Sequence, residues 1–453
     1  MWKIDRTTIF LYIVLFLFFW DLAFILGIRD PDRFPHPFRI FRLLGVSDFV
    51  RPFLTMIRDV IFSCGSGGII GLGIGSLIVR NSALTHSALR TLRLGLWFPF
   101  MVLFATPDPF ILNFVAVMLC SCYHYLVARC IFGLEGHETR VHVAREAILQ
   151  ALLISLLSQI WTGYWKWFEF AALYQPATGW GAFIALLGLL FFINWVFRSN
   201  FDLIAVRRGI ILNNDSNNAS WKSCLAPLLF AVGFFIIWHA VVSLRFPRFQ
   251  SSLLGVVEAG YQLLKNGDIS GDVGISLLEI FGGILLGGCI AFVAFWLMFA
   301  QGVIRNALCT VLPLLYLSPI VLWLLAWFML GWINPPPGFV YFWHKVIAVG
   351  LLTFFTLIQG LWGLRDKPLV YRVLLAMDDA IPIAFVAMLF GELWAATAGL
   401  GFMMTVASAT NQLDKGLAGS LITFLLLIGL STAVRWIATR VSLAAEVIRP
   451  FPA

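Results

Sequence analysis

The chain of 453 residues is 60% hydrophobic and only 12% charged, with a mean hydropathy of +0.91. A soluble globular domain has about half apolar and about a quarter charged residues, so this composition excludes that class and predicts a multi-pass membrane protein in contact with lipid. The formal net charge of +8 does not indicate a nucleic-acid partner, because arginine and lysine retained in cytoplasmic loops account for it.

Apolar runs of spanning length predict an all-α fold with about 12 transmembrane helices, since about 20 residues cross a bilayer. The first run follows Lys3 and Arg6, is long enough to span and has no small-residue cleavage site after it, so we expect an uncleaved helix. The predicted helices of the first half are 8–28, 59–79, 91–106, 110–132, 147–165 and 180–197. Those of the second half are 226–244, 273–300, 308–331, 343–364, 373–395 and 417–440.

Paired landmarks indicate that the chain is a direct repeat of two six-helix halves, 1–206 and 226–453, joined by a polar cytoplasmic linker at 207–225. Each half has a glycine-studded helix near its start and a Gly-Leu pair followed by charged residues further on. Small residues about four apart let helix backbones approach closely in lipid. We therefore expect helix packing at Gly67, Gly71, Gly75, Gly283 and Gly287.

The distribution of basic residues predicts that both termini are cytoplasmic. With that orientation the short outer loops carry almost no arginine or lysine, and the basic clusters fall inside. Candidate contacts for a cytoplasmic partner are Arg140, Arg145, Arg365, Lys367 and Arg372.

The stretch 380–402 is the part of the sequence that points most directly to a function. It places Glu392 inside an apolar run and a Gly-Leu-Gly turn, Gly399 to Gly401, shortly afterwards. A carboxylate in a membrane helix is costly, so it is by default a candidate functional residue. The alternative is that Glu392 lies near the interface or caps a neighbouring helix and takes no part in transport.

These residues also carry a family resemblance. Pro382, the Gly391-Glu392 pair and Gly399-Leu400-Gly401, together with the stretch 251–288, resemble inner-membrane permeases of ABC importers of the nitrate/sulfonate/taurine type. The resemblance implies a translocation subunit for small anions in a bacterial inner membrane, with a separate ABC ATPase and a solute-binding protein as partners. It places Pro382, Glu392, Gly399, Leu400 and Gly401 near the translocation path or the interface between the halves.

The loops at 133–146 and 363–373 depart from that family. Its permeases have a cytoplasmic Glu-Ala-Ala helix, followed by a glycine, that docks onto the ATPase, and both loops are too short to hold one. The alternative function is therefore a degenerate permease-fold protein that serves as a structural or accessory subunit, with other integral membrane proteins as partners and without ATP-driven transport.

No motif in the sequence argues for an enzyme. The seven histidines are scattered, and neither a zinc motif H-E-x-x-H nor a phosphate-binding G-x-x-x-x-G-K-[ST] loop occurs. We expect no catalytic residue, no metal and no cofactor. His142 is assigned to a solvated loop, Asp378 and Asp379 to a cap at the start of the eleventh helix, and Arg435 to the inner end of the last helix.

Overall fold

The computed structural model describes residues 47–95, 109–131, 133, 135–161, 232–233, 236, 253–300, 340–363, 368–395, 398–410 and 412–448. Almost all of these residues are helical and none lies in a strand, which confirms the all-α prediction for this part of the chain. The predicted helices 8–28, 180–197 and 308–331, most of 91–106 and 226–244, and the whole linker at 207–225 fall outside the described residues. The count of about 12 helices therefore stays a prediction.

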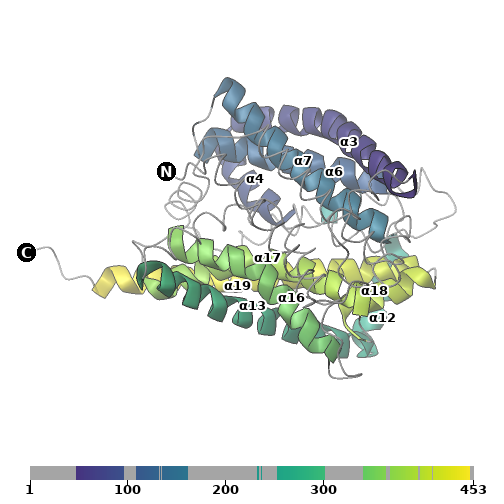
Figure 1. Ribbon diagram of the computed structural model, residues 1–453. Coiled ribbons are helices and arrows are strands. Elements are labelled where there is room, and N and C mark those ends of the chain that lie inside the picture. Colours follow the sequence, from purple (N-terminus) through teal and green to yellow (C-terminus); the bar gives the residue numbers. More distant parts are fainter. Residues whose placement is uncertain are drawn as a thin grey trace, which may run out of the picture.

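The described helices of the first half form one group, which lies above the others in Figure 1. Helix α3 packs against α6 and α7, and α4 packs against α3 and α6. The bounds are α3 (Ser47–Val79), α4 (Ser82–Gly95), α6 (Pro109–Leu126), which runs into a π-helical turn η2 (Val127–Ile131), and α7 (Gly136–Trp161).

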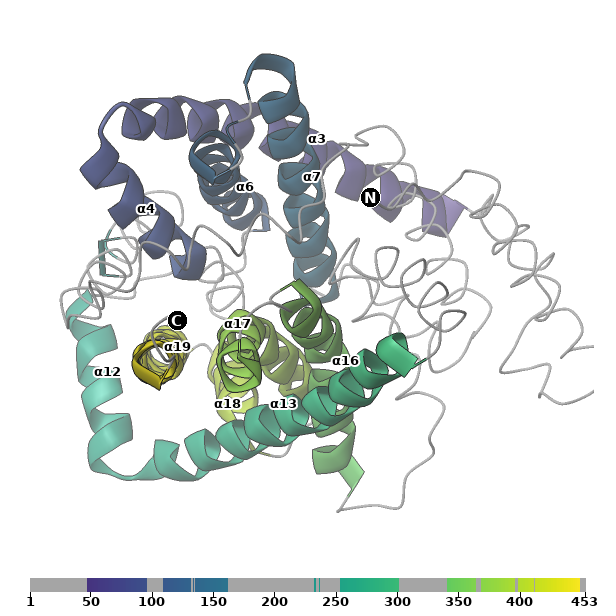
Figure 2. The same cartoon turned by 90° about the vertical axis from the view of Figure 1, so that its left-hand side faces the viewer.

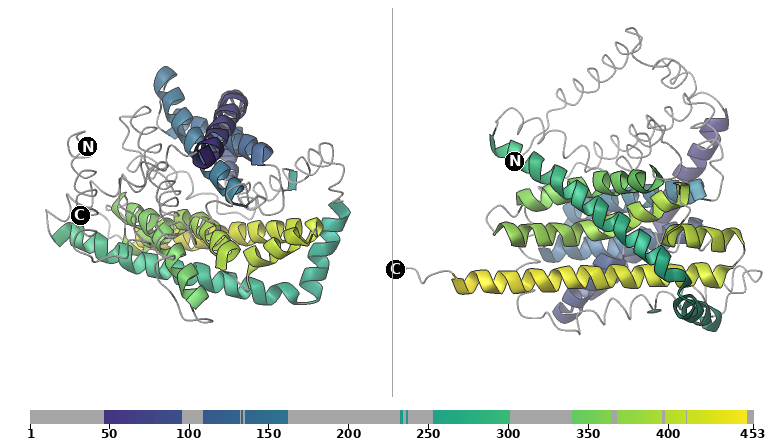
Figure 3. Two further views of the ribbon diagram at one scale, coloured as in Figure 1. Left: turned by 45° about the vertical axis from the view of Figure 1, so that its right-hand side comes forward. Right: turned by 90° about the horizontal axis from the view of Figure 1, so that it is seen from below.

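The helices of the second half form a layer beneath this group (Figures 1 and 2). Helix α13 runs obliquely across the layer, as the right-hand view of Figure 3 shows, and packs along α16 and α17. Helices α12 and α18 lie at the end of the layer opposite the C-terminus of α19. The bounds are α12 (Leu253–Lys265), α13 (Asp268–Ala300), α16 (Val340–Gly363), α17 (Leu369–Ala395), α18 (Leu400–Ala409) and α19 (Leu413–Ile448).

The two groups share one packing pattern. In the first, α3, α6 and α7 contact one another pairwise, and in the second α13, α16 and α17 do the same. Glycines allow α3 to lie close to α6, and α13 to lie close to α16. A Cβ atom at Gly67 would lie 2.7 Å from the Phe114 carbonyl oxygen, and one at Gly287 would lie 2.5 Å from the Gly350 carbonyl oxygen. Gly71, Gly75 and Gly283 are similarly pressed against α6 or α16. Close backbone packing of this kind drives the association of helices in lipid, where the burial of apolar surface contributes little to the free energy of association.

Four helical segments in the described part of the chain are long and apolar enough to cross a membrane: Ile57–Val79, Leu112–Cys130, Ile269–Leu297 and Leu413–Val441. Large apolar side chains point outward along two of them, including Phe62 and Ile69 on α3 and Leu285 and Trp296 on α13. An apolar outer face of this kind fits helices that face lipid. The fold therefore supports a membrane protein.

Several helix boundaries differ from those predicted. Helix α7 begins at Gly136, so most of the predicted 133–146 loop is helix, and His142 is buried rather than solvated. Helix α17 begins at Leu369, which places Asp378 in its third turn and makes the cap assignment wrong. Helices α12 and α18 were not predicted, because both are too short to cross a membrane and the prediction counted only apolar runs of spanning length.

Candidate functional site

Helix α17 carries two clusters of buried polar side chains. The cap cluster contains Glu392 together with Asp272, Ser276 and Glu279 from α13 and Lys345 from α16. The inter-half cluster contains Asp378 and Asp379 with Arg93 from α4 and Ser431 and Arg435 from α19. At about 1.5 Å of rise per residue, Asp378 and Glu392 are about 21 Å apart along the helix.

The cap cluster closes the N-terminus of α18. The first N–H groups of any helix have no partner within it, and the same end carries a partial positive charge. Here Gly399 N–H donates to Asp272 Oδ1 at 2.7 Å, Leu400 N–H donates to Ser276 Oγ at 2.9 Å, and Gly401 N–H donates to Glu392 Oε2 at 2.5 Å. Three consecutive N–H groups are thus satisfied by side chains of two other helices.

The Gly-Leu-Gly sequence follows from this geometry. Gly399 has φ of 120°, a conformation that side chains other than glycine rarely adopt. A Cβ atom at Gly399 would also fall on the Glu392 carboxylate, and one at Gly401 would lie 2.8 Å from the Leu389 carbonyl oxygen. Glycine at both positions lets the chain break after α17 and restart as α18 directly over the carboxylate.

Glu392 is also tied to α13 and lies beside a second carboxyl group. Ser276 Oγ donates to Glu392 Oε1 at 2.5 Å, so both oxygens of Glu392 accept a hydrogen bond. Glu279, one turn along α13 from Ser276, lies near enough to Glu392 for their charges to influence each other and forms an ion pair with Lys345 of α16. Glu279 and Glu392 are 0% exposed and Lys345 is 4% exposed, so the three groups are removed from water together.

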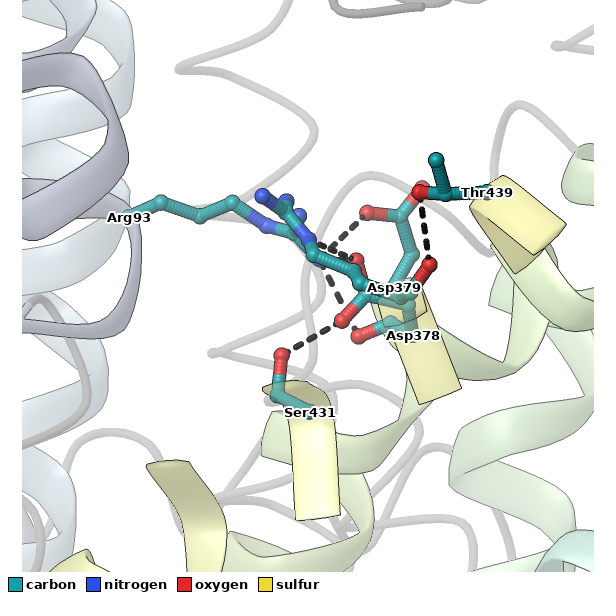
Figure 4. Close-up of polar contacts among 6 residues, drawn as sticks. Arg93, Asp378, Asp379, Ser431 and Thr439 are labelled. Carbon is teal, nitrogen blue, oxygen red and sulfur yellow. Dashed lines mark hydrogen bonds and ion pairs between the residues drawn. The ribbon is translucent and has the colours of Figure 1, made fainter. Parts of the chain in front are cut away.

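The inter-half cluster joins the first half to the second. Arg93 Nη2 lies 2.7 Å from Asp378 Oδ2 and 3.0 Å from Asp379 Oδ1, and donates to the Asp378 carbonyl oxygen at 3.1 Å. Figure 4 shows the Arg93 side chain reaching from α4 to these groups on α17. A side chain of the first half therefore completes a polar cluster in the second.

Asp378 is held from its own half as well. Arg435 Nε donates to Asp378 Oδ2 at 2.7 Å, and Ser431 Oγ donates to Asp378 Oδ1 at 2.5 Å. Asp378 is 1% exposed, so it depends on these donors for charge compensation. Two arginines and two aspartates leave the cluster with no net charge. This balance gives no excess positive charge with which to bind an anion.

The structure brings together four of the five residues predicted near a translocation path: Glu392, Gly399, Leu400 and Gly401. Pro382 is buried within α17 between the two clusters and belongs to neither. The described contacts of Glu392 come from the second half alone, which favours its role as a cap for a neighbouring helix. Its placement at the interface between the halves stays a prediction.

The residues predicted to contact a cytoplasmic partner differ in how exposed their side chains are. Arg140 is exposed on α7, whereas Arg145 is half-buried in the same helix. Arg372 lies over the Phe295 ring, 5.7 Å from its centroid, which links α17 to α13. Arg365 and Lys367 fall outside the described residues.

Sequence reasoning missed the residues that pair with the predicted carboxylates and helix ends in both clusters. No pattern in the sequence marked Ser276 or Asp272, and Arg93 belongs to one of the basic clusters that the distribution of arginine and lysine assigned to the cytoplasmic side. Lys345 could have indicated a buried carboxylate nearby, because a lysine buried near the start of an apolar helix needs a carboxylate partner. His142 was also misplaced: its ring packs edge-on against His124 at 5.3 Å between centroids.

Comparison with known protein families, with curated proteins and with solved structures finds no match to this chain. In the part of the chain that the structure describes, no group of three or more His, Cys, Asp or Glu side chains is placed to hold a metal ion.

Proposed function

We propose that this protein is a permease-like subunit of a membrane transport complex and that its two halves meet through the inter-half cluster. The observation that carries the proposal is the pairing of Arg93 on α4 with buried Asp378 on α17. Ionisable side chains inside a membrane protein are costly and usually mark sites of function. An arginine that crosses between two helical groups to reach such a carboxylate is suited to control how the groups sit against each other.

The repeated packing pattern supports the two-half architecture. The glycine-mediated contact of α3 with α6 has a counterpart in that of α13 with α16, and a third helix contacts both in each group. Two similar helical bundles in one chain are a common design for transporters, because one bundle can rock against the other around a central site. The full six-plus-six arrangement is part of the proposal.

The hydrogen-bond donors around Asp378 would allow the contact between Arg93 and Asp378 to break and re-form. A buried carboxylate left without any partner would cost about 3–5 kcal/mol. Arg435 and Ser431 belong to the same half as Asp378, so they remain with it if Arg93 withdraws. The half-to-half link can therefore break without leaving Asp378 unpaired. A low cost for separation is what a moving interface requires.

The class of substrate and the partners are further parts of the proposal. The resemblance to anion importers supports a small anion, a bacterial inner membrane, cytoplasmic termini and a separate ABC ATPase. Exposed Arg140, near the start of α7, is the described residue best placed for contact with a cytoplasmic partner.

The second candidate function is a structural subunit of a larger membrane complex. The cap cluster favours it, because capping of α18 accounts for Glu392 and for both glycines without any role in a pore. The short connection between α16 and α17, residues 364–368, also leaves little chain for a docking helix.

Purification from the native membrane in mild detergent tests the choice between these two functions. We expect an ABC ATPase to be recovered in stoichiometric amount, and Arg140→Glu to reduce that recovery. Lys265→Glu is the control, since Lys265 is also an exposed basic residue but lies at the end of α12, in the other half. A stable complex with other integral membrane proteins and no ATPase would favour the structural role and contradict the transport proposal.

A further inference from the structure

The cap cluster carries more negative than positive charge, and its charged groups are largely buried. Glu279 and Glu392 would contribute two negative charges if both were ionised, and Lys345 contributes one positive charge. All three side chains are buried. Two adjacent carboxylates in a low-dielectric site repel each other, and one of them is stabilised by taking up a proton.

The charges on the surrounding helices do not remove this excess. Asp272 on α13 adds a third carboxylate, which is occupied by the Gly399 N–H group. The N-terminus of α18 contributes about half a positive charge. Helix α19, which packs against α17 and α18, carries Asp414 and Lys415 at this end of the layer, and these two balance each other.

Hydrogen bonding distinguishes the two carboxyl groups. Each oxygen of Glu392 accepts a hydrogen bond, one from Ser276 and one from Gly401. The Lys345 ammonium group lies against Glu279 Oε1, but within the described part of the chain no N–H or O–H group is placed to donate to Glu279 Oε2. A buried carboxylate oxygen without a hydrogen-bond donor is costly. A proton on Glu279 Oε2 would supply the missing bond, because it could be donated to Glu392.

We propose that the cap cluster is a proton-binding site, in which Glu279 holds one proton and donates it to the carboxylate of Glu392 while Lys345 stays charged. The proton comes from water and leaves to water, so the three side chains cycle between net charges of zero and minus one. The site lies directly under the break between α17 and α18. Loss of the proton therefore places two facing carboxylates beneath that turn. The proposal does not depend on transport.

Infrared spectroscopy of the full-length protein in lipid vesicles tests the proposal, because a protonated carboxyl group has a C=O stretch that a carboxylate lacks. We expect this band at neutral pH, its loss in Glu279→Gln, and its loss in the wild type as the pH is raised. Glu258→Gln, at an exposed position on α12, is the matched control and should leave the band unchanged. A neutral-pH spectrum of Glu279→Gln identical to that of the wild type would overturn the proposal.

Two further measurements keep the test decisive if Glu279→Gln folds poorly. Lys345→Met removes the compensating ammonium group, so the second carboxyl group should also protonate and the band should grow. In the wild type, dicyclohexylcarbodiimide, which attacks protonated carboxyl groups in apolar surroundings, should modify Glu279 or Glu392 at neutral pH and spare exposed Glu135. A wild type with no protonated-carboxyl band and no such modification would contradict the proposal without recourse to any variant.

Discussion

The carboxylate of Glu392 accepts a hydrogen bond from the backbone N–H of Gly401 at 2.5 Å, across the break between α17 and α18. The same carboxylate accepts the hydroxyl of Ser276 on α13. One buried side chain therefore fixes the position of three helices. Loss of the Glu392 carboxylate should therefore lower the stability of the protein.

Replacement of Glu392 should destabilise the protein in proportion to the hydrogen bonds lost. Glu392→Ala leaves Gly401 N–H and the Ser276 hydroxyl without their acceptor in a buried place, which costs about 1–3 kcal/mol for each unsatisfied group. Glu392→Gln keeps the shape and one acceptor oxygen, so its effect should be smaller. Thermal unfolding in detergent measures both. Equal stability of Glu392→Ala and the wild type would show that the cap is not needed.

Gly399→Ala should also be destabilising, by about 1–3 kcal/mol, because side chains other than glycine are disfavoured at this φ and the added Cβ would meet the Glu392 carboxylate. The matched control is Gly429→Ala in α19, where nothing lies within 4 Å of the added atom. That control should be neutral or stabilising by up to about 1 kcal/mol through helix propensity. The prediction fails if the two variants unfold at the same temperature.

Close approach of α13 to α16 predicts a third effect. Gly287→Ala inserts a methyl group 2.5 Å from the Gly350 carbonyl oxygen, and overpacking of this kind costs about 1–3 kcal/mol. Gly73→Ala, in open space on α3, is the control. Unfolding of both variants in the same detergent provides the comparison, and a destabilised control with a stable Gly287→Ala would contradict the packing described here.

The inter-half cluster predicts unequal effects of its members. Asp378→Ala removes the buried carboxylate that Arg93 and Arg435 share and leaves Arg93 paired with the more exposed Asp379, so it should cost about 3–5 kcal/mol. Arg93→Ala should cost less, because Arg435 and Ser431 still satisfy Asp378. The double variant should be less destabilised than the sum of the two, as expected for residues in direct contact. Strictly additive losses would show that the pair is not coupled.

The sequence predicted the features that depend on local patterns. Apolar runs predicted the all-α class, and small residues spaced along one helix face predicted that Gly67, Gly71 and Gly287 lie at contacts between helices. Glu392 stood out because it is a charge in an apolar run. The proline at 368 would have placed the start of α17 correctly, since proline is favoured at the start of a helix. That start would have moved Asp378 away from a cap and into the helix interior.

The partners of these charges could not be read from the sequence. Arg93 and Asp378 are 285 residues apart, and no periodicity relates them. The capping of α18 by Asp272 and Ser276 likewise depends on where α13 passes, which is decided by the packing of α13 against α16 and α17. Short-range patterns determine the helices here, whereas the polar clusters arise only when distant helices are brought together.

The distance between the two halves tests the proposed function most directly. Spin labels at Arg80→Cys, directly after α3, and Arg440→Cys on α19 occupy exposed positions, one in each half, in a variant whose native cysteines are replaced by serine. We predict that a non-hydrolysable ATP analogue, added to native membrane vesicles that retain the partner subunits, produces a second distance between the labels. A single distance that is the same with and without the analogue would contradict a moving interface between the halves.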